Sequence, residues 1–327
     1  MSYSDLRVLV AGGAGFIGAH LVRALLGDGA EEVTVVDNYR TASADSLTPA
    51  SRLKVLQHDI IEPLQLDGPL DVIFNLACPA SPVHYQADPI ATWRSSVYGT
   101  DNLLTLARSK GARLVQASTS EVYGDPLESP QAETYRGNTS FLGPRACYDE
   151  GKRAAESLLM DFHRVHGMDV RIARLFNTYG PGMAEQDGRV VSNFIVQALR
   201  GEALTVYGNG RQTRSFCYVS DTVRGLMALG LREGLSGEVV NLGNPNEVTI
   251  LTLAEELGRL IGVPTSYTHC PVPPDDPRRR CPDISRARRL LDWGAEVALS
   301  EGLAATIADF RTRLDRRGKT LTGAESP

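Results

Sequence analysis

Two short motifs in the first half of the chain contain residue types that can do acid–base and redox chemistry. One is Tyr148-x-x-x-Lys152, whose spacing places both side chains on the same face of a helix. A tyrosine with a pKa of about 10 is a weak base at neutral pH, but a neighbouring ammonium group stabilises the phenolate and lowers that pKa. The same spacing is common on helix surfaces, so a catalytic role depends on what precedes the motif in the chain.

The second motif is the glycine-rich stretch GGAGFIG at 12–18, which directly follows a β-branched run at 7–11. Glycines let the backbone approach a pyrophosphate, and the start of the following helix supplies N–H donors. Asp37 ends the next β-branched run, roughly 20 residues further on, where dinucleotide sites place the acid that binds the ribose hydroxyls. A carboxylate there would repel a 2′-phosphate. The sequence therefore predicts NAD rather than NADP.

The first half of the chain also has the pattern of the sheet that would bring these motifs together. Continuous apolar runs alternate with helical stretches, which is typical of parallel strands buried on both faces and joined by crossover helices. The predicted fold class is α/β, a Rossmann-type doubly wound parallel sheet with a smaller α/β substrate lobe. We expect strands at 7–11, 32–37, 53–58, 71–77, 112–118 and 170–174, and helices at 89–109 and from about residue 147.

The composition changes after Asn177, where glycine and proline become denser. We expect residues 1–176 to form an NAD-binding Rossmann domain and residues 177–327 to form a substrate-binding lobe. A later segment, at about 215–243, is expected to return to the first domain. In open α/β folds, ligands bind at the carboxyl edge of the sheet, and the second lobe would pack over that edge.

A third catalytic partner is expected at the end of the fifth strand, in the stretch ASTSEVYG at 117–124. The hydroxyl of Thr119 or Ser120 can hydrogen-bond a reacting oxygen, and Glu121 adds a carboxylate beside them. Hydroxyls at a strand end also often cap their own backbone, and a loop glutamate is often solvated. Function is favoured here because the sheet would deliver a reacting centre to this position.

The overall composition narrows the classes of protein further. The net charge is −5 and no basic face is visible, so no nucleic-acid partner is expected. No apolar run reaches the roughly 20 residues of a membrane span, and an early first strand leaves no room for a signal peptide. We therefore expect a cytoplasmic protein without a membrane partner. Five cysteines without CxxC spacing predict neither a disulfide framework nor a metal site.

The glycine spacing GxxGxxG resembles that of the extended short-chain dehydrogenase/reductase family. The resemblance implies that Asp59 contacts adenine and that Leu76 and Ala77 lie beneath the nicotinamide ribose. Lys152 would also hold ribose hydroxyls. The residues expected around NAD are Gly12, Gly15, Phe16, Ile17, Gly18, Asp37, Asn38, Asp59, Ile60, Leu76, Ala77, Tyr148, Lys152 and Thr178.

Longer strings resemble one family of this branch, the UDP-glucuronate decarboxylases, which make UDP-xylose. They include NLACPASPVHY, ASTSEVYGDP, GPRACYDEGKR, RLFNTYGPGM and LTVYGNGRQTRSFCYVSD. The resemblance implies that Tyr148 removes the proton of the sugar 4-hydroxyl as NAD⁺ accepts the C4 hydride. The resulting β-keto acid would lose CO₂, and NADH would return its hydride. Thr119 would help Tyr148 to stabilise the charge on O4, while Glu121 with Ser120 would position the ring and handle the C5 proton.

The same resemblance implies a pocket for UDP-glucuronate between the two lobes. Arginine suits its diphosphate because the planar guanidinium donates paired hydrogen bonds. The residues expected to bind the substrate are Asn177, Arg189 and Asn193 at the lobe junction, and Tyr207, Gln212, Arg214 and Arg280 towards the nucleotide and diphosphate.

The chain departs from the family pattern at the margin of this pocket, for example at Gly182, where arginine is frequent. The sugar is therefore less firmly indicated than the reaction class. The alternatives are a UDP-glucuronate 4-epimerase, another NAD-dependent nucleotide-sugar epimerase or dehydratase, and an NAD-sensing protein without turnover. A sensor would have little need for Tyr148 and Lys152 together with a hydroxyl partner. The helices expected at 89–109 and 147–166 resemble the family's dimer interface, which implies a homodimer, although a buried core face explains the same apolar residues.

Overall fold

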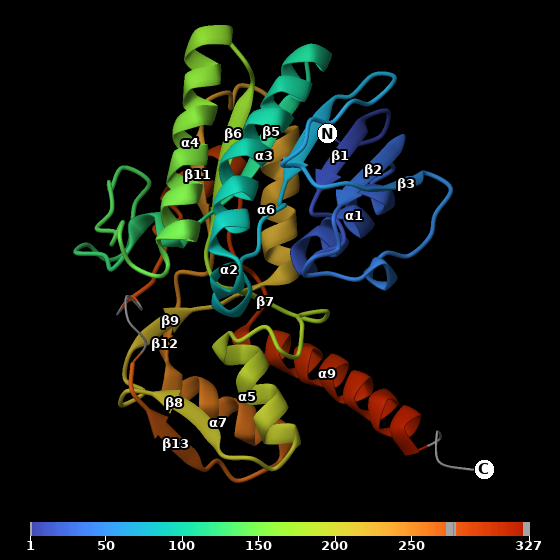
Figure 1. Cartoon of the computed structure of the whole chain (residues 1–327). Coiled ribbons are helices and arrows are strands. Elements are labelled where there is room, and N and C mark those ends of the chain that lie inside the picture. The colour runs from blue at the N-terminus through green and yellow to red at the C-terminus, as the bar shows by residue number, and fades with distance from the viewer. Residues whose placement is uncertain (1, 273–276, 278, 323–327) are drawn as a thin grey trace.

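The computed structural model describes residues 2–272, 277 and 279–322 (Figure 1). Seven parallel strands form its central sheet, in the order β3-β2-β1-β4-β5-β6-β11. This confirms the predicted fold class. The strands are β1 (Arg7–Ala11), β2 (Glu32–Asp37), β3 (Leu53–Gln57), β4 (Val72–Asn75), β5 (Arg113–Thr119), β6 (Val170–Leu175) and β11 (Val239–Leu242).

Helices cover both faces of this sheet because successive side chains of a strand point to opposite faces. On β1, Val8 and Val10 pack with α1, α6 and α8, while Leu9 and Ala11 pack with α3 and α4. In Figure 1, α3 and α4 run side by side, in contact along their lengths. The helices are α1 (Phe16–Gly27), α2 (Pro82–Ala87), α3 (Pro89–Lys110), α4 (Ala146–His166), α6 (Val219–Leu231) and α8 (Ser285–Leu291).

The element bounds predicted from the sequence agree with the observed bounds to within about two residues. The burial of β3 was not predicted correctly. Its residues 54–57 are exposed, because β3 is the edge strand and lacks a neighbour on one side. The expectation of burial on both faces is therefore wrong for this strand. Two short 3-10 helices follow strands of the sheet: η1 (Ala44–Ser46) after β2, and η2 (Ser120–Tyr123) directly after β5.

A smaller lobe lies below the sheet in Figure 1 and has its own core, which includes Phe194, Leu253 and Phe310. The segment expected to return to the sheet contains α6, which packs against α1, and β11, which pairs with β6. The exact domain boundaries stay a prediction. The lobe contains β7 (Thr178–Tyr179), α5 (Val190–Leu199), β8 (Leu204–Tyr207), β9 (Thr213–Ser215), β10 (Cys217–Tyr218), β12 (Glu247–Thr249), α7 (Ile250–Ile261), β13 (Tyr267–Cys270) and α9 (Leu299–Thr322). Over the described residues, none of the helices combines the length and apolar character needed to traverse a bilayer.

Candidate active site

A cavity of about 810 Å³ joins the carboxyl ends of the central strands to the smaller lobe. Every residue that the sequence assigned to NAD, to catalysis or to the substrate lines this one cavity, although their individual roles stay predictions. They are Gly12, Gly15, Phe16, Ile17, Gly18, Asp37, Asn38, Asp59, Ile60, Leu76, Ala77, Thr119, Ser120, Glu121, Tyr148, Lys152, Asn177, Thr178, Arg189, Asn193, Tyr207, Gln212, Arg214 and Arg280.

The glycine loop between β1 and α1 has a shape that side chains would destroy. Gly12 has a φ of +75°, and a Cβ there would lie 2.8 Å from the backbone of Leu76 and Ala77. A Cβ on Gly18 would lie 2.2 Å from the carbonyl oxygen of Gly12. These glycines therefore allow the loop, the start of α1 and the end of β4 to approach one another closely.

The start of α1 is open to an anion. Its N-cap is Gly15, which offers no capping side chain, and the first turn contains no acidic residue. The free N–H groups and the positive end of the helix dipole therefore face the cavity without a competing carboxylate. Together with the close glycine backbone, this arrangement fits the pyrophosphate of NAD.

Asp37 is held rigidly at the end of β2. One carboxylate oxygen accepts a hydrogen bond from the Ala14 N–H at 3.0 Å, and the other accepts one from the Tyr39 N–H at 2.9 Å. Asn38 donates to the carboxylate of Asp59 at 2.9 Å, which ties the ends of β2 and β3 together. The remaining lone pairs of Asp37 suit the ribose hydroxyls that the sequence assigned to it.

The predicted catalytic motif lies on α4, which packs against β5. Tyr148 is 5% exposed and Lys152 is 4% exposed. The Lys152 ammonium donates to the carbonyl oxygen of Ala117 at 2.9 Å and lies 5.9 Å from the centre of the Tyr148 ring. The Thr119 side chain is close enough to Tyr148 to lower the pKa of the phenol, which favours the phenolate. The structure therefore brings together the three residues predicted to form the catalytic group.

Burial raises the pKa of Tyr148 above its ordinary value, the nearby Cys78 raises it further, and the Thr119 side chain lowers it. Burial lowers the pKa of Lys152. A buried phenolate needs positive charge close by to form at neutral pH. Lys152 supplies such charge within the protein, and the positively charged nicotinamide ring of bound NAD⁺ would add to it.

Thr119 is the last residue of β5 and the N-cap of η2, which starts at Ser120, and both residues are buried. Thr119 also accepts a hydrogen bond from the Glu121 N–H at 3.2 Å, so it caps its own backbone as well as facing Tyr148. Both interpretations of Thr119 from the sequence therefore apply, since a hydroxyl can donate one hydrogen bond and accept two.

Glu121 is the centre of a buried charge cluster rather than a solvated loop residue. Its carboxylate accepts one hydrogen bond from Arg145 at 2.6 Å and one from Arg280 at 2.7 Å, and a second guanidinium nitrogen of Arg280 lies 2.7 Å from its other oxygen. Burial alone would raise its pKa, but Arg280 and Arg145 reverse this and lower the pKa below its ordinary value. Glu121 is therefore ionised at neutral pH, which suits a role in positioning better than one in donating a proton.

The structure separates the residues predicted at the nucleotide end. Arg280 joins Glu121 and approaches the Asn177 side chain at 3.4 Å, so it lies at the catalytic end of the cavity. Arg214 donates to the Thr213 carbonyl at 2.9 Å and is also close enough to Glu121 to lower the pKa of that carboxyl. The remaining pair, Tyr207 and Gln212, lies on β8 and the following turn, where Gln212 donates to the Tyr207 carbonyl.

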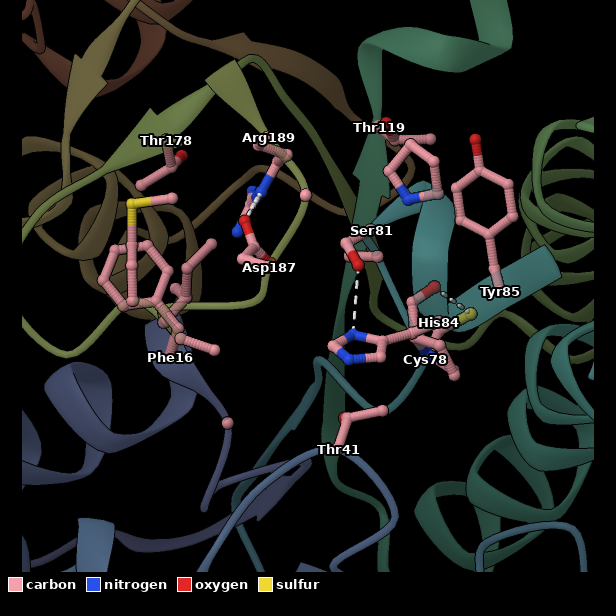
Figure 2. Close-up of a pocket in the computed structure, with 18 of the residues that line it drawn as sticks. Phe16, Thr41, Cys78, Ser81, His84, Tyr85, Thr119, Thr178, Asp187 and Arg189 are labelled. Atoms are coloured by element: carbon pink, nitrogen blue, oxygen red, sulfur yellow. Dashed lines mark hydrogen bonds and ion pairs between the residues drawn. The ribbon is translucent and has the colours of Figure 1, made fainter. Parts of the chain in front are cut away.

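Figure 2 shows the lobe junction, where Arg189 points towards Asp187 and forms an ion pair with it. Asn193 follows on α5 and donates to the carbonyl oxygen of Gly188 at 3.1 Å. The hydroxyl of Thr178 is engaged with Phe176 and Thr222, both at 3.0 Å. Thr178 therefore forms part of the cavity wall with its hydroxyl already satisfied.

Sequence reasoning missed two residues that lie beside the catalytic group. The ring of Tyr85, on α2, stacks on Tyr148 with centroids 5.0 Å apart, and its buried hydroxyl has no hydrogen-bond partner among the described residues. Arg145 precedes α4 and binds Glu121. Both residues occur in strings that carry the family resemblance, NLACPASPVHY and GPRACYDEGKR, which was the available signal.

Comparison with known proteins agrees with this geometry. The model of the NAD dependent epimerase/dehydratase family matches residues 8–243. UDP-glucuronic acid decarboxylase 6 of Arabidopsis thaliana is 54% identical over 314 residues, which are 95% of this chain and 90% of that protein. UDP-glucuronic acid decarboxylase 1 of Xenopus tropicalis is 49% identical over 314 residues, 95% of this chain and 73% of that protein. The resemblance recognised from the sequence is thus confirmed.

Solved structures with the same fold include a UDP-glucuronic acid 4-epimerase from Bacillus cereus in complex with UDP-glucuronic acid and NAD. It has a TM-score of 0.84 and 28% identity, over 94% of this chain and all of that one. A dTDP-glucose 4,6-dehydratase from Streptomyces venezuelae with NAD bound has a TM-score of 0.86 and 30% identity. The match covers 94% of this chain and 97% of that one. The expected dependence on NAD agrees with the family description. The chain belongs to the NAD dependent epimerase/dehydratase family.

Proposed function

We propose that this protein is a UDP-glucuronate decarboxylase that forms UDP-xylose and CO₂. The observation that carries the proposal is the buried Glu121–Arg145–Arg280 cluster beside Tyr148 and Lys152, because it adds guanidinium groups for a sugar carboxylate to an oxidation site. Relatives that are 51–54% identical to this chain over the aligned residues have the same activity in their names.

In the first step, Tyr148 removes the proton of the sugar 4-hydroxyl. Lys152 stabilises the phenolate, and the adjacent Thr119 side chain also lowers the pKa of Tyr148. Bound NAD would supply the hydride acceptor for C4 and the hydride that C4 regains at the end. The residues proposed to hold it are the glycine loop, Asp37, Asp59 and Lys152.

Oxidation at C4 turns the sugar into a β-keto acid, whose C5–C6 bond breaks as CO₂ leaves. The electron pair of that bond moves towards the 4-keto oxygen and forms an enolate. Tyr148, now protonated, and Thr119 can both donate hydrogen bonds to that oxygen. They are buried, so little water competes for the developing charge.

C5 then takes up a proton. The charge state of Glu121 decides whether this residue can donate that proton. Since two arginines keep Glu121 ionised, it holds Arg145 and Arg280 in place rather than giving up a proton. Ser120 is buried next to it and lines the cavity, so its hydroxyl keeps the predicted part in relaying a proton to C5.

The smaller lobe is proposed to hold UDP. Arg189 and Arg214 lie on the wall of the cavity that this lobe provides, and arginine pairs well with a diphosphate. Tyr207 is 41% exposed, which leaves its ring free to contact a uracil base. Arg280, which the sequence placed with this group, is assigned here to the sugar end because it binds Glu121.

A homodimer is also proposed. The outer face of α3 exposes Ile90, Trp93 and Tyr98, the last two in an edge-to-face contact at 5.7 Å. Exposed aromatic and aliphatic side chains on one helix suit a contact with a second copy, in agreement with the family resemblance. Light scattering on the purified protein checks this, and a mass of one chain at micromolar concentration would contradict it.

The function is tested by incubating UDP-glucuronate with the protein and NAD⁺ and following the nucleotide sugar by mass spectrometry. Loss of CO₂ with UDP-xylose as the product is expected, and the Tyr148→Phe variant serves as the control. An unchanged mass with inverted configuration at C4 would instead make the protein a 4-epimerase. No change in UDP-glucuronate would overturn the proposal.

A further inference from the structure

A second carboxyl group lies buried next to the catalytic tyrosine and has no part in the mechanism above. Asp149 directly follows Tyr148 on α4 and is 7% exposed. One of its oxygens, Oδ1, has no hydrogen-bond partner among the described residues. The other, Oδ2, lies 3.9 Å from Nε of Arg145, which is too long for a hydrogen bond.

Asp149 and Glu121 lie near the same arginines, but only Glu121 accepts hydrogen bonds from them. Glu121 accepts three short N–H contacts from Arg145 and Arg280, which favour its ionised form. Asp149 accepts no such hydrogen bond from the residues that the structure describes, so the effect of burial is offset less. Burial and the charge of Glu121 raise the pKa of Asp149 to about 7, although Arg145 and Arg280 lower it. Asp149 is therefore the member of this cluster that changes charge near neutral pH.

The two phenols and the thiol beside Asp149 stay neutral in that range. Burial raises the pKa of Tyr148 on the same helix and that of Tyr85 on α2, so both phenols stay neutral in the free protein. Burial also raises the pKa of the Cys147 thiol. Glu150, the next residue of α4, is paired with Arg153 at 3.3 Å and accepts a hydrogen bond from Thr139.

The charge of the cluster thus depends on one proton. Within these four groups, Arg145 and Arg280 contribute two positive charges, while Glu121 and Asp149 contribute two negative charges when both are ionised. Protonation of Asp149 leaves one net positive charge on the four. Arg214 adds a further positive charge near Glu121. Arg145 and Arg280 line the cavity while Asp149 does not, so Asp149 acts on a ligand only through its neighbours.

We infer that Asp149 is a positioning residue that controls, through Arg145, how tightly this cluster holds a carboxylated sugar. When Asp149 is protonated, the cluster is cationic and holds the sugar carboxylate firmly. When Asp149 ionises, it competes with that carboxylate for Arg145 and weakens the hold. This inference rests on the proposed function, because it needs a nucleotide sugar with a carboxylate as the ligand.

The sign of the effect follows from linkage. A bound carboxylate adds negative charge near Asp149 and raises its pKa further, so binding takes up a proton near pH 7. The dissociation constant therefore rises with pH above the pKa of the free protein, by at most about tenfold per pH unit. UDP-glucose, which has the same nucleotide but no carboxylate, should bind with nearly constant affinity between pH 6 and 8.

The test is calorimetric titration of NAD-loaded protein with UDP-glucuronate and with UDP-glucose at pH 6, 7 and 8. A Tyr148→Phe background prevents turnover during the titration. At pH 7, two buffers with different ionisation enthalpies report proton uptake directly. Asp149→Asn removes the ionisable group and keeps the shape. Asp161→Asn is the matched control, because Asp161 is an exposed aspartate of the same helix.

The expected result is that UDP-glucuronate binds with proton uptake and a pH-dependent affinity, and that only Asp149→Asn abolishes both. Between pH 6 and 8, the Asp149→Asn variant should bind UDP-glucuronate with nearly the affinity that the unsubstituted protein shows at pH 6. Equal pH dependence in Asp149→Asn, or for UDP-glucose, would overturn the inference while CO₂ release by the wild type still supports the proposed function. Absence of UDP-glucuronate binding at every pH would overturn both.

Discussion

Lys152→Met tests whether the ammonium group sets the basicity of the catalytic tyrosine. Methionine has a similar length but no charge, so the change removes positive charge and preserves most of the packing. The ammonium lies 5.9 Å from the centre of the Tyr148 ring, over which a phenolate spreads its charge. Burial lowers the pKa of Lys152, so the prediction also tests whether this group remains protonated.

The size of the effect follows from that distance. Two unit charges 5.9 Å apart in a medium of effective dielectric constant about 20 interact by roughly 3 kcal/mol, or about 2 pKa units. The base acts in its deprotonated form, so the rate rises with pH through the pKa of Tyr148. Without the ammonium, this rising limb should move about 2 units to higher pH. At a pH below both limbs, the rate should fall about 100-fold.

Loss of the Lys152 side-chain nitrogen should cost little stability. The Ala117 carbonyl oxygen, which accepts from Lys152 at 2.9 Å, also accepts from the Gln116 side chain at 3.1 Å. The oxygen therefore keeps a partner in the variant. We expect the free energy of unfolding to change by no more than about 1 kcal/mol, which is the net contribution of one hydrogen bond.

The assay is CO₂ release from UDP-glucuronate between pH 6 and 10, at NAD concentrations that saturate each variant. Saturation has to be checked by a separate NAD titration, because Lys152 is also predicted to hold the ribose. Lys152→Arg is the charge-preserving control and should leave the limb within about half a unit of the wild type. A folded, NAD-saturated Lys152→Met whose limb does not move would refute the reasoning, since Lys152 would then be neutral or remote from the phenolate.

Three further changes address the tyrosine, the acid of β2 and the glycine loop. Tyr148→Phe should keep NAD affinity and lower turnover by about 10²–10⁴-fold; near-normal CO₂ release would exclude it as the base. Asp37→Ala leaves the buried Ala14 N–H without its acceptor and should weaken NAD by about 1–3 kcal/mol, with UDP-sugar affinity retained; equal losses in both titrations would indicate misfolding. Gly18→Ala places a Cβ 2.2 Å from a backbone oxygen of the loop and should abolish NAD binding, whereas Gly27→Ala on the same helix meets nothing within 4 Å and should bind NAD normally.

Much of the fold could be predicted because its signals are local. Buried parallel strands read as short apolar runs, and the helix bounds at 89 and 146–147 follow from proline and from the onset of amphipathic spacing. The exposure of residues 54–57 could not be predicted, since β3 has the composition of a strand and only the strand order makes it an edge.

The candidate site also has features that the sequence reveals and features that depend on the folded chain. Glycines 12–18, Asp37 and the Tyr148-x-x-x-Lys152 motif were recognisable because the chemistry of each depends on spacing within one segment. The burial that shifts the pKa values of Tyr148 and Lys152 depends on how α4 packs against β5. That packing brings together groups that lie far apart in the chain.

The fold class, the glycine loop and the Tyr148–Lys152 pair predicted to be catalytic could all be recognised in the sequence, because local spacing encodes each of them. The folded chain was needed to show that Arg280 binds Glu121, 159 residues away in the chain, and that Tyr85 stacks on Tyr148. It also decided that Asp149 is buried with one carboxylate oxygen that no described residue hydrogen-bonds. Contacts between distant segments, and the loss of water around them, set the charge and pKa of these groups, and neither is written in the order of neighbouring residues.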